Sequence, residues 1–586
     1  MNRPIEDYAL LGDLQTAALV SRTGSIDWLC LPRFDAPACF AALLGTEENG
    51  HWRIAPTGVE VCSRRSYRGD TLVLDTIWET ETGTVRVVDY MPPRGEAPDL
   101  VRLVEGVSGR VEMTSHLRVR LDYGNVKPYL PASDDDVLVV AGPDALWLTS
   151  PVPVTGAGEG LDSVFTVSAG ESVSFVLTHH PSHLGRPTAV EPHSALDETM
   201  AFWIDWIDTC AYHGQWEADV RRALVTLKAL TYAPTGGILA AATASLPEVI
   251  GGVRNWDYRY CWLRDATFTL QALLGTGHLA EARAWREWLV RAVAGEPSKL
   301  QIMYALDGAR RLNEADLNWL PGYRGSTPVR IGNAAADQHQ LDTWGEVLVC
   351  LDEARVAGLH PAESAWRMQT GLMDWLESNW SAPDNGLWEI RGERRQFVHS
   401  KALAWAGADR MIRTAEAHDM AAPLDAWRSM RDQIHAEVCE SGFDANRNTF
   451  TQSYGSPETD AALLLLPRVG FVDWSDPRMV GTVDAVIEDL SVDGLLLRYD
   501  TGANVDGLPE GEGAFVACSF WLVDALHGLG RGKEALALFE RLRGLRNDVG
   551  LLAEQVDPLT GAHLGNTPQA FSMVGLVNSA RRLTQT

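Results

Sequence analysis

The hydrophobic pattern of this chain changes once, near Pro192, and no other feature of the sequence constrains the fold as strongly. Before that point, short alternating or β-branched runs recur between turns such as Arg68-Gly69-Asp70. Many short strands at close spacing are typical of an antiparallel sandwich. After that point, apolar residues recur at helical spacing to the end of the chain. The clearest predicted strands are 71–78, 84–90, 137–141 and 172–178.

A chain of 586 residues is longer than one compact core usually holds, so we expect several domains. We predict a β-sandwich over 1–190, a linker-helix region over 191–215 and a helical domain over 216–586. Long loops between the helices are compatible with a double ring of helices, and a simple bundle, which favours short connections, is the alternative. The predicted helices are 198–210, 216–233, 262–275, 278–293, 338–357, 362–379, 399–416, 422–440, 457–466, 476–490, 515–529, 532–544 and 568–583.

The charge balance narrows the choice of partners. With 50 Lys and Arg against 78 Asp and Glu, the net charge of −28 would repel nucleic acid and anionic lipid, but not a neutral sugar. The eight cysteines form no CxxC pair and lie mostly in apolar runs, which is typical of buried thiols in a reducing compartment. No basic segment followed by an apolar stretch opens the chain, so we expect a cytoplasmic protein. The oligomeric state stays open, and a homo-oligomer is one option.

Two loops of the helical half concentrate polar and aromatic side chains. In the first, Arg264 and Asp265 stand at a predicted helix start, where they offer fixed donors and acceptors to sugar hydroxyls. Tyr258 and Trp262 precede them and provide aromatic walls. The second loop, 322–345, carries more polar side chains than a helix start requires. Each loop taken alone is also compatible with ordinary surface structure.

Two further loops each place a glutamate next to apolar residues. Glu389 lies between Trp388 and Ile390, and an apolar neighbourhood favours the protonated carboxyl that a general acid needs. Glu554 follows an apolar run before the last predicted helix. Alone, Glu389 is more typical of an ordinary exposed acid, and Glu554 of an acid that flanks a helix. Together, two carboxylates on separate loops beside aromatic and Arg–Asp segments are what glycoside hydrolysis requires.

Ordered motifs along nearly the whole chain resemble glycoside hydrolase family 15, the family of glucoamylases and of bacterial and archaeal trehalases. The run 24–35 resembles the opening of the family's β-sandwich, and 248–265 resembles the first substrate loop of its barrel. The resemblance implies an N-terminal antiparallel β-sandwich followed by a C-terminal (α/α)6 helical barrel. Further matching segments are 330–333, 386–392, 495–499, 512–522 and 554–571.

The resemblance also implies roles for individual residues. Glu389, directly after the Trp of the LWE motif, stands at the position of the general acid. Glu554, directly before the Gln of the EQ-x-D motif, stands at the position of the general base. The familiar form has two adjacent Glu residues before its Gly-Ala-Phe element, whereas Gly511 separates them here, and Glu512 is left outside the catalytic pair. The motifs and the resemblance together predict a sugar site of Tyr258, Trp262, Arg264, Asp265, Trp388 and Arg498.

We therefore predict an inverting, exo-acting hydrolase of a small neutral α-glucoside that releases β-glucose, without a metal or organic cofactor. A single displacement needs room for water, so we expect the two carboxyl groups to lie about 6.5–9.5 Å apart. We rank α,α-trehalose first and short malto- or isomalto-oligosaccharides second, because the short segment after Glu554 leaves no room for a starch-binding domain and 563–571 resembles the trehalase-like branch.

Rival interpretations are a catalytically silent carbohydrate-binding protein, a uronate-directed hydrolase and a phosphorylase. Glu389 and Glu554 are both retained, which argues against a silent protein, and a phosphorylase would replace the base with a phosphate site. The sequence shows no extra basic cluster for a uronate.

Overall fold

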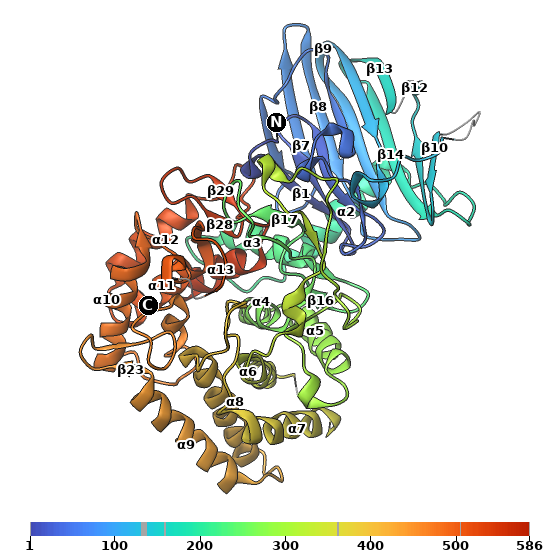
Figure 1. Cartoon of the computed structure of the whole chain (residues 1–586). Helices are drawn as coiled ribbons and strands as arrows, with labels where there is room; N and C mark the ends of the chain where they lie inside the picture. The colour runs from blue at the N-terminus through green and yellow to red at the C-terminus, as the bar shows by residue number, and fades with distance from the viewer. Residues whose placement is uncertain (1, 131–136, 158–159, 360–362, 504–505, 585–586) are drawn as a thin grey trace.

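Two lobes of different secondary structure make up the chain, as the sequence pattern predicts (Figure 1). Strands dominate up to the end of β14 (Ser172–Pro181), and the long helices begin with α2 (Pro192–Ile207). Among the residues that the structure describes, every helix is too short or too polar to cross a lipid bilayer. The computed structural model describes residues 2–130, 137–157, 160–359, 363–503 and 506–584.

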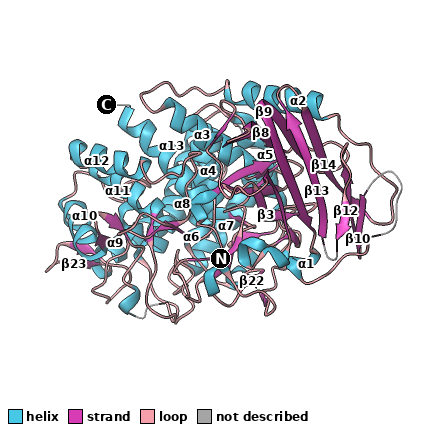
Figure 2. Cartoon of the chain, turned by 90° about the horizontal axis from the view of Figure 1, so that it is seen from above, coloured by secondary structure: helices cyan, strands magenta, loops and turns pink. Residues whose placement is uncertain are grey.

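The strand-rich lobe is organised by β9 (Asp99–Arg118), a 20-residue strand that belongs to two sheets (Figure 2). The first half of β9 pairs with β8 and β14, and the second half pairs with β5 and β13. Gly106 and Gly109 lie between the halves. A Cβ at Gly106 would come within 2.1 Å of the Ser168 carbonyl oxygen, and Gly109 has a φ of 65°. Because only glycine fits these positions, β9 can pass from one sheet to the other.

The two sheets face each other through aromatic side chains, which confirms the predicted antiparallel sandwich. Trp52 and Phe165 of one sheet contact Phe175 of the other, with ring centroids 6.3 and 5.4 Å apart. The remaining strands of this lobe are β1 (Tyr8–Gly12), β2 (Ala17–Ser21), β3 (Ser25–Cys30), β4 (Ala38–Phe40), β5 (His51–Pro56), β6 (Arg64–Tyr67), β7 (Leu74–Thr80), β8 (Gly83–Tyr90), β10 (Val137–Ala141), β11 (Asp144–Thr149), β12 (Thr155–Ala157) and β13 (Gly160–Ser168).

Helix α2 belongs structurally to the strand-rich lobe. Its Ala195 and Leu196 are buried together with Val88 of β8 and Val101 of β9 on the outer face of the sheet. The next helix, α3 (Glu217–Ala229), packs against the last helix of the second lobe. We therefore propose to keep the division into 1–190, 191–215 and 216–586, with the boundary between the lobes inside the middle segment.

The second lobe is a double ring of helices. Among the described residues, six inner elements each pack against the next, and α13 packs against α4, so the ring closes. The inner elements are α4 (Leu263–Gly275), α6 (Asp342–Val356), α8 (Val398–Ala417), the 3-10 helix η7 (Ala461–Leu465), α11 (Val516–Gly528) and α13 (Ala570–Thr584). Their outer partners, in the same order, are α5 (Leu279–Ala292), α7 (Glu363–Asn379), α9 (Leu424–Ser441), α10 (Pro477–Leu490), α12 (Gly532–Arg543) and α3.

Burial separates the two rings. The inner helix α11 is buried from Val516 through Leu526, as expected for a helix covered on all sides. The outer helix α12 buries Ala535, Phe539 and Leu542, which recur at helical spacing on one face. The predicted (α/α)6 barrel is therefore confirmed, and the alternative of a simple bundle is wrong.

One inner element differs from its prediction. Instead of an α-helix over 457–466, the chain forms η7, which is five residues long and buried throughout. The Asp460 carboxylate caps its start by accepting a hydrogen bond from the Ala462 N–H at 2.7 Å. Asp460 itself is extended, with a φ of −147°, and pairs with Tyr499, so the helix cannot begin earlier. At the other end, Pro467 has no backbone N–H with which to continue the helical hydrogen bonds.

Candidate active site

The loops that precede the inner helices meet at one end of the barrel and form a pocket. Its walls come from segments 254–265, 387–391, 498–499 and 506–515 and from residues at the start of α13. Glu554 is fully buried next to this pocket, beneath Tyr258. The other predicted site residues all line the pocket: Tyr258, Trp262, Arg264, Asp265, Trp388, Glu389 and Arg498.

The segment before α4 is anchored on both sides. Strand β18 (Asn255–Asp257) pairs with β17 (Ala244–Pro247), and β19 (Cys261–Trp262) pairs with β20 (Met303–Tyr304). Between these pairs, the Arg259 guanidinium is buried against the Asp257 carboxylate at 2.6 Å. It also donates to the Ala36 carbonyl at 2.9 Å and the Tyr123 hydroxyl at 2.8 Å. The strand-rich lobe therefore fixes the loop that carries Tyr258 and Trp262.

Glu389 is held by the loop before α4. The Trp262 indole N–H donates to Glu389 Oε1 at 2.6 Å, and Arg264 Nη2 lies 3.7 Å from the same oxygen. The Arg264 Nη1 donates to the Leu387 carbonyl at 2.7 Å, and Gln338 donates to the Glu389 carbonyl at 3.0 Å. Glu389 has a φ of 60°, a costly conformation for a residue with a side chain. These contacts hold the carboxyl group at the pocket wall despite that cost.

Glu554 is enclosed more tightly. The Tyr258 hydroxyl donates to Oε1 at 2.7 Å, and the Asn566 backbone N–H donates to Oε2 at 3.2 Å. A Cβ at Gly565 would stand 2.3 Å from Oε2, so only glycine fits beside the carboxyl group. Burial and, next, the charge of Glu248 raise the pKa of Glu554 to about 8, and the Arg498 charge opposes this rise.

The rings of Tyr258 and Trp262 connect the two carboxyl groups. Their centroids lie 5.3 Å apart in an edge-to-face arrangement. The Tyr258 hydroxyl donates to Glu554, and the Trp262 indole N–H donates to Glu389. A single rigid segment thus orients both acids, which lie far apart in the sequence.

Arg498 is oriented by two acids. Its Nη2 donates to Glu248 Oε2 at 2.6 Å, and its Nε donates to Glu512 Oε2 at 3.0 Å. Glu512, which the sequence motif leaves without a role, is therefore a fixed partner of Arg498. Burial raises the pKa of Glu248, which lies beside Glu554 as well. The sequence does not reveal this cluster, because Glu248 and Arg498 are 250 residues apart.

Trp388 and Asp265 complete the predicted sugar site. The Trp388 indole donates to Asp460 Oδ1 at 2.8 Å, a buried partner that the sequence analysis does not predict. The cap position of Asp460 before an apolar run is the signal that marks it. Asp265 accepts from Arg264 Nε at 3.1 Å, and burial raises the pKa of its carboxyl group to about 6.

Some residues of the predicted polar loop 322–345 line the pocket, and others support its wall. Asn333 lines the pocket and Gln338 holds the Glu389 carbonyl. His339 instead packs edge-on against the stacked rings of Trp344 and Trp375. In the part of the chain that the structure describes, no group of three His, Cys, Asp or Glu side chains is arranged to hold a metal ion.

Comparison with known proteins places the chain in a family. The family model "Glycosyl hydrolases family 15" matches residues 218–581. This chain belongs to glycosyl hydrolases family 15. A second model, "Trehalase-like, N-terminal", matches residues 1–157. The predicted family and the predicted class of enzyme, a glycoside hydrolase, are both confirmed.

Curated relatives match this family 15 hydrolase over almost its whole length. A trehalase of Mycobacterium tuberculosis is 37% identical over 98% of this chain and 89% of that protein. A trehalase of Thermoplasma volcanium is 33% identical over 99% of this chain and 94% of that protein. A bacterial glucoamylase solved with acarbose has the same fold, with a TM-score of 0.73, 12% identity, and coverage of 99% of this chain and 94% of that chain.

Proposed function

We propose that this glycoside hydrolase cleaves α,α-trehalose with inversion at the attacked anomeric carbon, so that the attacked ring is released as β-glucose and the leaving ring as α-glucose. The two carboxyl groups held by one aromatic pair, Tyr258 and Trp262, carry this proposal. The trehalase names of relatives that match almost the whole chain support the choice of substrate.

In the proposed reaction, Glu389 is protonated and donates to the glycosidic oxygen as the bond to the anomeric carbon breaks. A water molecule on the opposite ring face forms the new bond to that carbon, and ionised Glu554 takes the proton that this water loses. Arg264, Asp265 and Arg498 would position the sugar. Correct orientation alone can contribute about 7 kcal/mol to lowering such a barrier.

Stereochemistry tests the single displacement. Proton NMR of the anomeric signals during the first turnovers should show β-glucose appearing before mutarotation equilibrates it. With inversion, each trehalose gives one β-glucose from the attacked ring and one α-glucose from the leaving ring, so the two anomers should appear in equal amounts. Early product that is α-glucose alone, or a trapped glycosyl-enzyme, would show that a carboxyl group acts as a nucleophile and would refute the assignment of Glu554 as a base.

A substrate panel tests the choice of trehalose. We expect kcat/KM to be highest for trehalose among trehalose, maltose, isomaltose and maltotetraose. A preference for maltotetraose of about tenfold, which corresponds to about 1.4 kcal/mol of transition-state binding, would assign the chain to glucoamylase activity instead.

We also propose a cytoplasmic location. All eight cysteines are free thiols and seven of them are buried, which supports folding in a reducing compartment. Labelling of the unfolded protein with a thiol reagent straight after cell lysis would test this, and a recovered disulfide would contradict it.

A further inference from the structure

The pocket has an outer part that the predicted sugar site does not include. Arg254, Trp256, Asn333 and Arg391 line it together with residues 506 and 508. Arg391 follows the proposed general acid Glu389 by two residues on the same loop. The glycosidic oxygen joins two rings, and the predicted sugar site takes the ring at the cleaved end, so the remaining wall beside the general acid is left for the leaving ring.

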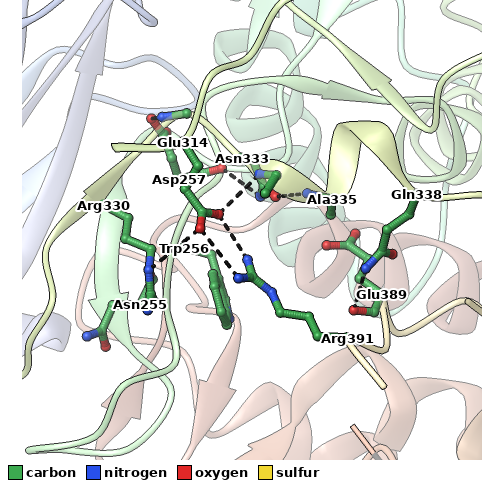
Figure 3. Close-up of polar contacts among 12 residues, drawn as sticks. Asn255, Trp256, Asp257, Glu314, Arg330, Asn333, Ala335, Gln338, Glu389 and Arg391 are labelled. Atoms are coloured by element: carbon green, nitrogen blue, oxygen red, sulfur yellow. Dashed lines mark hydrogen bonds and ion pairs between the residues drawn. The ribbon is translucent and has the colours of Figure 1, made fainter. Parts of the chain in front are cut away.

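Trp256 forms the centre of this wall. Figure 3 shows its indole ring lying between the side chains of Arg330 and Arg391. The guanidinium carbons lie 4.7 and 4.3 Å from the ring centroid. Glu314 joins the two arginines: its Oε2 accepts from Arg391 Nη2 at 2.9 Å, and its Oε1 lies 3.9 Å from Arg330 Nε. Since arginines lie against the Trp256 ring, the ring holds Arg391 in place and does not stack on a sugar.

The same wall is bonded to the surroundings of Glu554. The Trp256 indole N–H donates to Glu248 at 3.1 Å, and the Trp256 carbonyl accepts from the Asn566 side chain at 2.9 Å. Asn566 also donates to Glu554 through its backbone N–H. Arg391 is therefore positioned relative to both proposed catalytic carboxyl groups.

The charges of the wall identify the kind of ligand that fits it. Arg391 and Arg330 are opposed by Glu314 and by Asp316, whose Oδ1 lies 3.7 Å from Arg330 Nε. Arg254 forms a buried ion pair with Asp506 at 2.6 Å. Because acids balance these arginines, the wall suits a neutral ring and not a uronate.

Arg391 keeps donors for such a ring. Its side chain is 32% exposed, and its two hydrogen bonds to Glu314 use Nη1 and Nη2. A guanidinium has five N–H donors in a fixed fork, so further donors are directed away from Glu314. Sugar hydroxyl oxygens are suitable acceptors for them.

We propose that Arg391, stacked on Trp256 and held by Glu314, binds the hydroxyl groups of the leaving sugar and sets the preference for a neutral disaccharide. This proposal rests on the proposed hydrolysis of trehalose and names the residue that recognises its second ring. Glu314, Arg330 and Trp256 act as positioning residues for Arg391.

Two substrates separate recognition of the leaving group from the rest of the site. Trehalose fills the outer part of the pocket, whereas α-glucosyl fluoride carries a leaving group too small to reach Arg391. For Arg391→Ala we expect kcat/KM for trehalose to fall about tenfold or more, the effect of one or two lost hydrogen bonds, and kcat/KM for the fluoride to fall less than about threefold. Arg391→Lys should remain impaired on trehalose, because lysine lacks the planar fork.

Arg394→Ala is the matched control, since Arg394 is an exposed arginine of the same loop that does not line the pocket. Equal losses on both substrates in Arg391→Ala, no loss on either, or full rescue by lysine would each overturn the proposal. If the wild-type enzyme cleaves another disaccharide and not trehalose, the proposed substrate fails. The same comparison with that disaccharide then still decides the role of Arg391.

Discussion

Replacing Glu248 by Gln should move the acidic limb of the pH profile to lower pH. Glu248 and Glu512 both accept hydrogen bonds from the buried guanidinium of Arg498, and the charge of Arg498 also acts on Glu554. Burial and neighbouring negative charge disfavour ionisation, and the pKa values of both Glu248 and Glu554 are raised. The proposed base must be ionised to accept a proton, so the pKa of Glu554 governs activity at low pH.

The size of the effect follows from the causes of that pKa. Burial is the largest cause of the rise in the pKa of Glu554 from 4.5 to about 8, and the charge of Glu248 is the second. Glutamine removes the negative charge and keeps one acceptor oxygen, which can serve either the Trp256 indole or Arg498 but not both. We therefore expect the pKa of Glu554 to fall by about one pH unit, equivalent to about 1.4 kcal/mol, and not by the whole rise.

The assay is kcat/KM for trehalose as a function of pH at constant ionic strength, because this parameter reports the ionisations of the free enzyme. Glu346→Gln is a suitable control, since Glu346 is a buried acid of α6 whose charge is not among the causes that set the pKa of Glu554. Its acidic limb should not move. An acidic limb that stays in place or moves to higher pH in Glu248→Gln would refute the reasoning.

Further variants test the rest of the site. Glu389→Gln and Glu554→Gln should each fold and lose about 10²–10⁴-fold in kcat on trehalose. On α-glucosyl fluoride, whose leaving group needs little help from an acid, only Glu554→Gln should remain strongly impaired. The reverse pattern would exchange the roles of the two residues. Tyr258→Phe removes the hydrogen bond to Glu554 and should lower kcat with little change in KM, whereas a purely KM effect would contradict a role in orienting the base. Gly565→Ala should destabilise the protein by about 1–3 kcal/mol in urea unfolding, because φ is 71° and the added Cβ meets the Glu554 carboxyl, and unchanged stability would show that the loop relaxes.

Local patterns predicted most of the fold. Helical periodicity places α8 and α13 within two residues of their observed limits, because buried faces and caps lie close together in the sequence. The error at 457–466 has a local and a distant cause, since Pro467 lacks the N–H that would continue η7, and Asp460, which precedes η7, is extended and pairs with Tyr499. The confirmed double ring depends on contacts between helices that are far apart in the chain. The sequence pattern alone therefore could not exclude a simple helix bundle.

In the candidate site too, some residues can be predicted from the local sequence, whereas others depend on distant partners. Glu389 and Glu554 each lie in a short motif, and the residues next to them in the sequence already indicate their surroundings. The roles of Glu248 and Asp460 depend on partners in other loops, Arg498 and Trp388, and no spacing rule connects them. Whether Arg391 faces solvent or lies against an aromatic ring is a property of the assembled loops alone.

The strand-rich lobe contributes to the site without lining it. Arg259 anchors the loop that carries Tyr258 to the Tyr123 hydroxyl of that lobe, at 2.8 Å. Asn547, in the segment that leads to Glu554, donates to two backbone carbonyls near the N-terminus at 3.1 and 2.9 Å. The Tyr258–Glu554 hydrogen bond therefore joins two loops that rest on the same support. A misplacement of about 1 Å can cost about 100-fold in rate, so we infer that this lobe maintains the geometry of the proposed base.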